Sequence, residues 1–273
     1  MSTVPRPSAA AAALLQGAVT TRFTPHPAFR ELSRLRQDQA DAPARLRLVL
    51  SVYPHLVERM VSAGPGSAEP REGMGQAVAD GINLFGFRAM HATAMLSCVV
   101  HPFDGVTHHL DAVSFWRRAA LAAATGSAVG ATAGGGLDED AAIAGLLVHL
   151  GWLALDQSGA QYLDRLETAA DGNPPTEDHE IDAFGFSIRE LTATLLRAWE
   201  TPPEITRAAV DASVGVDGSA LAGVLLQGLA AADAILAGEE PEPAVALSIR
   251  GRVGSTQALL TRVDALLSGV MLQ

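Results

Sequence analysis

The chain of 273 residues is poor in aromatic residues, in cysteine and in basic charge. Aromatic residues make up 5% of the chain, whereas apolar residues, chiefly Ala, Leu and Val, make up 48%. A β-sandwich usually needs more aromatic and β-branched residues, so this composition favours closely packed helices. We therefore predict an all-α fold, with ample length to bury a core.

The low number of basic residues limits which molecules the chain is expected to bind. There are 19 Lys and Arg against 30 Asp and Glu, which gives a net charge of −11. Such a charge opposes broad contact with nucleic-acid phosphates or anionic lipids, so neither nucleic acid nor membrane is an expected partner. We interpret the local group of arginines near the start as a solvated helix face; it comprises Arg30, Arg34, Arg36, Arg45 and Arg47.

Cysteine and long apolar runs are also scarce. The single cysteine, Cys98, excludes an intramolecular disulfide and favours a reducing compartment. It lies in the apolar run AMLSCVV, without a neighbouring cation in sequence, which predicts a buried, inert thiol. No segment reaches the roughly 18 uninterrupted apolar residues of a membrane span. The Ala-Leu run within residues 1–22 lacks the compact basic region of a signal peptide. We therefore expect a soluble, cytoplasmic protein.

The hydrophobic pattern predicts helices throughout, because no run alternates with a period of two. Residues 1–22 are expected to form a flexible tail. The helices predicted up to residue 100 follow Pro27 and Pro43, cover 55–63 and 75–85, and resume after Gly86; a loop is expected at 64–75. The stretch 101–111 is interpreted as the junction between two lobes.

The second half of the chain continues the helical pattern. A helix over roughly 139–157 is apolar all round, which predicts a central position. Three acidic residues, 138–140, lie at its N-terminus, where negative charge suits the helix dipole. A single final helix is predicted from Pro243. The expected organisation is a tail (1–22), an N-terminal helical lobe (23–104), a second helical lobe (105–240) and a C-terminal helix (241–273).

A series of short segments, in order along residues 23–240, resembles the HDOD family. These proteins are the noncatalytic relatives of the HD phosphohydrolases and occur in bacterial signalling. The segments are FTPHPAF, YPHLVERMVSAG, QAVADGINLFGFRAM, SFWRRAALAAA, AGLLVHLGWLAL, FGFSIRELTATLLRAWETPPEI and LAAADAILA. The resemblance implies an N-terminal helical lobe packed on an HD-like lobe.

The chain departs from the HD phosphohydrolases at the metal-ligand positions. In their frame the first histidine falls at Arg118, the His-Asp pair at Val148 and His149, and a later histidine at Ile188, whereas Asp233 keeps a ligand type. A hydrolytic centre needs three or more N or O ligands, and here two are left beside an arginine. We therefore interpret these five residues as a vestigial HD pocket and expect no catalytic residue, no metal and no cofactor.

Three functions follow from this interpretation. The leading one is a non-enzymatic signalling adaptor, or regulatory protein, that contacts another signalling protein. The alternative is a receptor for a small anionic ligand such as a nucleotide, whose phosphate Arg118 would bind. The third is a residual metal-dependent phosphohydrolase. The partner, the pathway and the oligomeric state are left open.

Other residues have a simpler interpretation. Trp116 and Trp199 are expected to pack in the core, and His108 and His109 to lie on a surface loop. Trp152, where the family frame has a lysine, is expected either to close the old pocket or to form a protein-contact surface. Residues 252–256 lack the GxxxxGK[ST] spacing of a P-loop.

The family frame also predicts a contact. If the backbone is retained, Arg118 should lie near Asp233, with its charge in place of the missing metal. His149 is interpreted first as a core histidine satisfied by a neighbour's carbonyl or carboxylate group, with ligand recognition as the alternative. It could also hydrogen-bond the carboxylate of Asp233. A buried pair of this kind predicts that Arg118→Ala costs about 3–5 kcal/mol.

Overall fold

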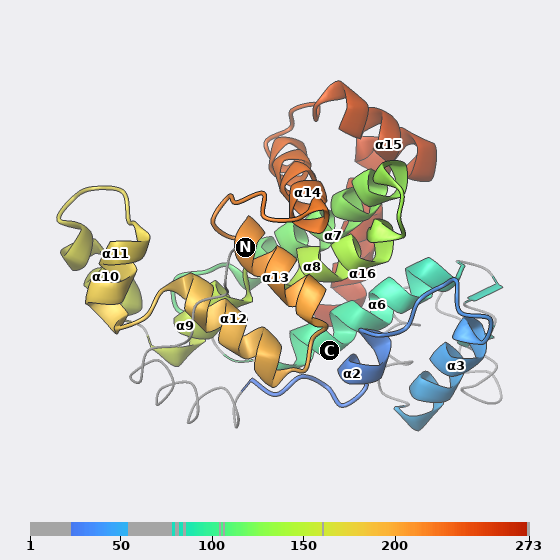
Figure 1. Cartoon of the computed structure of the whole chain (residues 1–273), viewed down its shortest axis with the longest axis horizontal. Coiled ribbons are helices and arrows are strands. Elements are labelled where there is room, and N and C mark those ends of the chain that lie inside the picture. Colours follow the sequence, from blue (N-terminus) through green and yellow to red (C-terminus); the bar gives the residue numbers. More distant parts are fainter. Residues whose placement is uncertain are drawn as a thin grey trace.

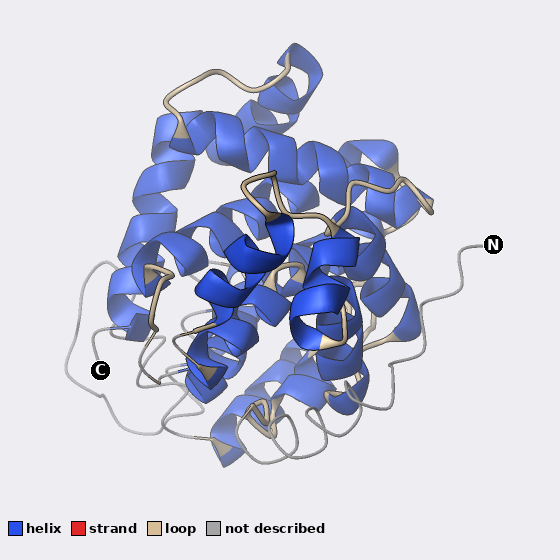
Figure 2. Ribbon diagram, turned by 90° about the vertical axis from the view of Figure 1, so that its left-hand side faces the viewer, coloured by secondary structure: helices blue, strands red, loops and turns tan. Residues whose placement is uncertain are grey.

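The computed structural model describes residues 23–53, 78–79, 82–83, 86–103, 105, 107–159 and 161–271. Throughout these residues the regular structure is helical and no strand occurs, which confirms the predicted all-α class (Figure 2). The helices are α2 (Phe29–Leu32), α3 (Ala42–Val52), α6 (Phe87–Val100), η1 (His101–Phe103), α7 (Ala112–Ala133), α8 (Leu137–Leu147), α9 (Leu150–Ser158), α10 (Tyr162–Ala170), α11 (Glu177–Phe184), α12 (Ile188–Ala198), α13 (Pro203–Ala212), α14 (Ala220–Leu236), α15 (Pro243–Val253) and α16 (Thr256–Met271). The predicted tail, the predicted helix at 55–63 and its loop lie outside the described residues.

Short polar side chains begin many of these helices. The Asp111 carboxylate accepts a hydrogen bond from the backbone N–H of Ser114 at the start of α7, and Ser219 caps α14 in the same way. Thr176 and Ser187 form capping boxes at α11 and α12. Each cap satisfies backbone N–H groups that have no partner within the helix, which fixes where the helix begins.

Helix α7 is the centre of the fold and packs along α8 and α14 (Figure 1). Glycines allow the backbones to touch. A Cβ added at Gly145 of α8 would lie 2.6 Å from the backbone N of Ala123, and one at Gly228 of α14 would lie 2.6 Å from the Cα of Gly126. The hydroxyl of Thr125 also donates to the carbonyl oxygen of Gly228 across 2.7 Å. Side chains that flank these crossings are thereby held within reach of one another.

The predicted single helix at 139–157 is wrong in one respect. Helix α8 ends at Leu147 and α9 begins at Leu150, because His149 leaves the helical conformation with φ −109° and ψ 10°. The combined stretch Leu137–Ser158 is long and apolar enough to cross a membrane by length and composition alone. However, 78% of its most apolar window is buried inside the fold, which is the burial of a core helix.

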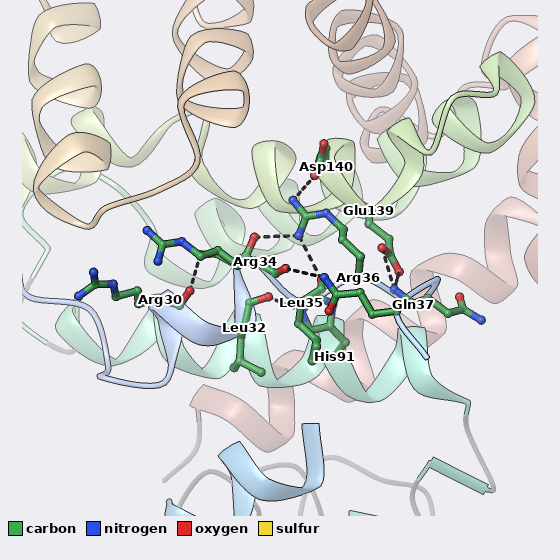
Figure 3. A network of polar contacts seen from close by, with 11 residues as sticks. Arg30, Leu32, Arg34, Leu35, Arg36, Gln37, His91, Glu139 and Asp140 are labelled. Atoms are coloured by element: carbon green, nitrogen blue, oxygen red, sulfur yellow. Dashed lines mark hydrogen bonds and ion pairs between the residues drawn. The ribbon is translucent and has the colours of Figure 1, made fainter. Parts of the chain in front are cut away.

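Hydrogen bonds and an ion pair join the segment after α2 to the first turn of α8 (Figure 3). The Arg36 guanidinium donates to the carboxylate of Asp140, and the backbone N–H of Gln37 donates to both oxygens of Glu139, at 3.0 and 3.1 Å. Arg36 therefore joins the segment after α2 to α8 and does not belong to the solvated helix face that the sequence predicted. These contacts join residues about one hundred positions apart in the chain.

A buried carboxylate fastens the junction at 101–111. Asp156 of α9 accepts the backbone N–H groups of His108 and His109, each at 2.8 Å. Gln157 donates to the carbonyl oxygens of Phe103 and Gly105. Both histidine side chains are exposed, as predicted for a surface loop. The proposed division between lobes at 104 and 105 stays a prediction.

The large core residues lie where the sequence placed them. Trp116 and Trp199 are buried, and the Trp199 indole N–H donates to the carbonyl oxygen of Phe23. Cys98 is a buried free thiol, and burial raises its pKa far above the ordinary value, because the thiolate would lose its hydration. The predicted inert cysteine is consistent with this environment.

The C-terminal segment differs from the single helix expected over 241–273. It forms α15 and α16, which are separated at Gly254, a residue with φ +88° that favours glycine. Helix α16 returns along α7 and α6, and Arg117 of α7 pairs with Asp264 of α16 at 2.7 Å.

The contact at Gly228 can be tested with a pair of matched variants. Gly228→Ala should lower the free energy of unfolding by about 1–3 kcal/mol, because the new methyl group meets the backbone of α7. Gly251→Ala is the control, since a Cβ there meets nothing within 4 Å. This second change should stabilise α15 by about 0.5–1 kcal/mol. Equal effects of the two variants in urea denaturation would contradict the close packing.

Candidate functional site

Arg118 lies on α7, about two turns after the cap at Asp111. Its neighbours Trp116 and Ala119 are buried and fix this part of the helix against the core. The Arg118 side chain is 39% exposed, so it lies at the edge of the helical packing and not in the interior.

Asp233 lies in the last turn of α14 and meets Arg118 through a two-pronged ion pair. The distance from Arg118 Nε to Asp233 Oδ1 is 2.7 Å, and that from Nη2 to Oδ2 is 2.8 Å. A carboxylate near a helix C-terminus faces the negative end of the helix dipole, so the guanidinium offsets an unfavourable position. The predicted contact between Arg118 and Asp233 is confirmed.

His149 joins the same cluster from the break between α8 and α9. Its Nε2 atom lies 3.0 Å from Nη1 of Arg118. A guanidinium can only donate, so Nε2 must accept and the ring proton must sit on Nδ1. The predicted partner of His149, a carbonyl or carboxylate group, is therefore wrong, because His149 accepts a hydrogen bond from the Arg118 guanidinium.

The three ionisable groups shift one another's pKa values in consistent directions. Burial, followed by the positive charge of Arg118, lowers the pKa of His149 to about 4. The hydrogen bonds from Arg118 lower the pKa of Asp233, and the same bonds raise the pKa of Arg118. At neutral pH the cluster therefore consists of a neutral imidazole, a carboxylate and a guanidinium.

The other two residues of the predicted pocket are apolar and buried. Val148 directly precedes His149, and Ile188 begins α12, where its side chain packs close to Gly151 of α9. Neither side chain has an atom that could bind a cation. The structure therefore brings together Arg118, His149 and Asp233 through hydrogen bonds, while Val148 and Ile188 contribute packing.

This donor set does not suit a divalent cation. The lone pair of His149 Nε2 and both oxygens of Asp233 already accept from Arg118. Among the described residues, no group of three or more His, Cys, Asp or Glu side chains is placed to hold a metal ion. A metal at this position would have to displace a guanidinium and overcome its positive charge.

The Arg118–Asp233 pair was expected to be buried, and this prediction is wrong. The Asp233 side chain is 50% exposed, so water solvates part of its charge even without Arg118. The expected loss of 3–5 kcal/mol for Arg118→Ala applies to fully buried pairs, and an exposed pair is worth about 1 kcal/mol or less.

Sequence reasoning missed a second ion pair. Arg189 Nη2 donates to Oδ1 of Asp211 at 3.1 Å, and the Asp211 side chain is buried. The adjacent Arg189 and Ile188 begin α12, whereas Asp211 lies in the last turn of α13. A charged residue in each of two successive helices was the available signal, but sequence alone did not show that the helices pack together. Trp152 of α9 lies near Tyr162, with ring centroids 6.5 Å apart, and its role stays a prediction.

Comparisons with known proteins agree with this architecture. Residues 25–213 match the model of the HDOD domain family. A “Putative phosphohydrolase” from Shewanella amazonensis SB2B has a similar structure, with a TM-score of 0.67, 19% identity, and coverage of 94% of this chain and 98% of that chain. No curated protein matched the sequence significantly.

Two further solved structures share the fold. One is an HDOD domain protein from Geobacter sulfurreducens, with a TM-score of 0.65, 15% identity, and coverage of 93% of this chain and 87% of that one. The other is a “Putative signal transduction protein” from Marinobacter aquaeolei VT8, with a TM-score of 0.63, 19% identity, and coverage of 99% and 68%. At these identities the likeness establishes the fold alone.

The exposure of the ion pair leads to a stability prediction. Arg118→Ala should lower the free energy of unfolding at pH 7 by about 1 kcal/mol, because water replaces the lost partner of Asp233. Arg207→Ala is a suitable control, since Arg207 is exposed on α13 and should change stability by no more than about 0.5 kcal/mol. A loss of several kcal/mol for Arg118→Ala in urea denaturation would indicate that Asp233 is desolvated after all.

The protonation state of His149 is a separate prediction. Its ring should titrate near pH 4 in NMR, with the proton on Nδ1 at neutral pH. Arg118→Met should raise this pKa but leave it below 6.5, because burial, the larger cause, is retained. The folded pKa lies below the unfolded value, so the stabilising contribution is present above pH 6.5 and lost as pH falls to about 4.

Site-specific titration is needed because His91 acts in the same direction. Burial also lowers the pKa of His91, so the protonation of His91 likewise lowers the stability of the fold as pH falls. His149→Gln identifies the His149 signal. A His149 pKa near 6.5 in the wild-type protein, or a proton on Nε2, would rule out the proposed hydrogen bond from Arg118.

Proposed function

This chain belongs to the HDOD domain family, and we propose that it is a non-enzymatic regulatory protein in bacterial signalling. It would act in the cytoplasm through contacts with another signalling protein. The family consists generally of noncatalytic relatives of the HD phosphohydrolases. The observation that carries the proposal is the Arg118 guanidinium, which binds His149 and Asp233, the two potential ligands left in the vestigial HD pocket.

The chemistry of this cluster supports a role other than hydrolysis. Metal-dependent hydrolysis requires a cation that lowers the pKa of a bound water molecule. Here the positive charge belongs to the Arg118 side chain, which cannot coordinate a water molecule as a metal ion does. Neutral His149 has its acceptor nitrogen engaged, so it is poorly placed to take a proton from water. A signalling role is also in keeping with the name of the structural relative from Marinobacter aquaeolei VT8.

The nucleotide-receptor alternative is less well supported. Arg118 would bind a phosphate with the same fork that now binds Asp233. A phosphate at this position would have to compete with the carboxylate and would add negative charge next to it. The phosphohydrolase alternative rests on the name of the relative from Shewanella amazonensis SB2B, for which the comparison shows the fold alone.

Metal binding and hydrolysis can be tested in the intact protein. The wild-type chain should contain no stoichiometric Mn, Fe or Mg by elemental analysis and should not hydrolyse a phosphodiester with added Mn²⁺. Neither divalent metals nor nucleotides should raise its melting temperature. The triple variant Arg118→His, Val148→His, His149→Asp restores the ligand types of the HD frame beside Asp233. It should gain affinity for Mn²⁺ in calorimetry.

The outcomes separate the three functions. Stabilisation of the wild-type chain by nucleotides, lost in Arg118→Ala, would favour the receptor. Metal-dependent hydrolysis lost in both His149→Ala and Asp233→Ala would favour the enzyme. A pull-down from the native host with the wild-type chain then identifies the partner, and a failure to enrich any signalling protein would count against the adaptor.

A further inference from the structure

A cavity of about 530 Å³ lies between α6, α7, α8, α15 and α16. None of Arg118, His149 and Asp233 lines it, so it is separate from the vestigial HD pocket. Its volume is within the range of small-molecule sites. Its walls come from helices before, within and after the central pair α7 and α8, so a bound molecule would contact segments that are far apart in the chain.

Most of the described residues that line the cavity are apolar, and many of them are small. The alanines among them are Ala89 and Ala92 of α6, Ala120, Ala123, Ala124 and Ala128 of α7, and Ala142 of α8. Longer apolar residues, among them Met95, Ile143 and Leu146, complete the walls. Walls of this kind offer few hydrogen bonds to water, so water in the cavity is weakly held.

The charged groups at one end of the cavity balance one another. Arg88 and Arg252 both donate to the same carboxylate oxygen of Asp138, at 2.8 and 3.0 Å. Glu139 follows in the chain and supplies a second negative charge, and both of its oxygens accept the backbone N–H of Gln37. Two positive and two negative charges therefore meet here, and none is left for a charged ligand.

Arg262 lies apart from this balanced group. Asp264, two residues further along α16, pairs with Arg117. Arg252 instead donates to Ser127, which lies about 15 Å further along α7 than Arg117. The Arg262 side chain is exposed, so it lies at an edge of the cavity where water solvates its charge.

The uncharged polar side chains of the lining also have partners. Burial lowers the pKa of His91, so its ring is neutral, and its Nε2–H donates to the carbonyl oxygen of Leu32 across 2.7 Å. The hydroxyl of Thr93 donates to a backbone carbonyl oxygen of its own helix, and Ser127 accepts from Arg252. Polar groups on a ligand would therefore gain little from these walls.

We propose that this cavity binds a small, uncharged molecule that consists largely of hydrocarbon. Such a molecule moves apolar surface out of water and displaces water that the walls hold weakly. A charged or strongly polar molecule would lose its hydration and find no free partner in exchange. A nucleotide is therefore a poor fit. The proposal goes beyond the proposed function, because it gives the regulatory protein a ligand site outside the vestigial HD pocket.

A matched pair of fluorescent probes tests both the site and its chemistry. N-phenyl-1-naphthylamine is uncharged, and 8-anilinonaphthalene-1-sulfonate has the same aromatic frame with an added sulfonate. The neutral probe should bind saturably to one site per chain, and naphthalene should displace it. The sulfonate probe should bind at least about tenfold more weakly, because its charge would lose hydration without gaining a partner. No saturable binding of the neutral probe, or equal affinity for the two probes, would overturn the proposal.

Variants locate the site. Ala124→Phe should fill the cavity and abolish saturable binding of the neutral probe, while circular dichroism reports whether the helices are retained. Ala131→Phe is the matched control, because Ala131 is exposed on the same helix and does not line the cavity. If Ala124→Phe does not fold, Ala142→Leu on α8 makes the same test with a smaller side chain. Binding that the cavity variant and the control retain equally would place the probe elsewhere and contradict the proposal.

The vestigial HD pocket and this cavity can fail independently. Metal binding or hydrolysis at His149 and Asp233 would overturn the proposed function without affecting the probe assay. Conversely, Arg118→Ala should leave the affinity for N-phenyl-1-naphthylamine unchanged, because Arg118 is not part of the cavity lining.

Discussion

The close approach of α7 to α8 and α14 is the constraint on which the rest of the structure depends. At Gly145 and Gly228 the helices touch through backbone atoms, so no side chain separates them. This spacing allows Arg118 of α7 to reach Asp233 of α14 and His149 after α8 with short hydrogen bonds. The same small-residue packing leaves a cavity beside α7 and α8, which residues of α6, α15 and α16 also line.

An arginine does not simply imitate a metal ion. A divalent cation accepts lone pairs from neutral imidazole and from carboxylate, and it keeps positions open for water or substrate. The guanidinium of Arg118 donates to the same atoms, so it adds to the effect of burial in keeping His149 neutral, and it keeps Asp233 ionised. However, its hydrogen bonds occupy the acceptor atoms of both residues. A guanidinium also cannot bind a water molecule and lower its pKa as a metal ion does. An arginine at a metal-ligand position can therefore hold the neighbouring ligand types together without supplying the chemistry of a metal ion.

The sequence predicted the helical class and one long-range contact. Composition and the absence of two-residue alternation were enough for the class, and the HDOD resemblance placed Arg118 opposite Asp233. The break at His149 was missed because the apolar pattern runs through it, and the nearby glycines, Gly145 and Gly151, lie inside the two helices and not at the break. By contrast, Gly254 was a visible signal for the break between α15 and α16. The cavity could not be read from any local pattern, because five separate helices form it.

The exposure of the Arg118 pair explains how a site can change while its fold persists. A half-exposed ion pair contributes about 1 kcal/mol or less, whereas burial of a single leucine or isoleucine contributes about 1.5–3 kcal/mol. The stability of the helical core therefore comes from buried apolar residues such as Trp116 and Leu147, and not from the cluster at its edge. A substitution at position 118 would therefore leave those core contacts in place. A helical scaffold held together in this way can tolerate changes at the edge of its packing without loss of the fold.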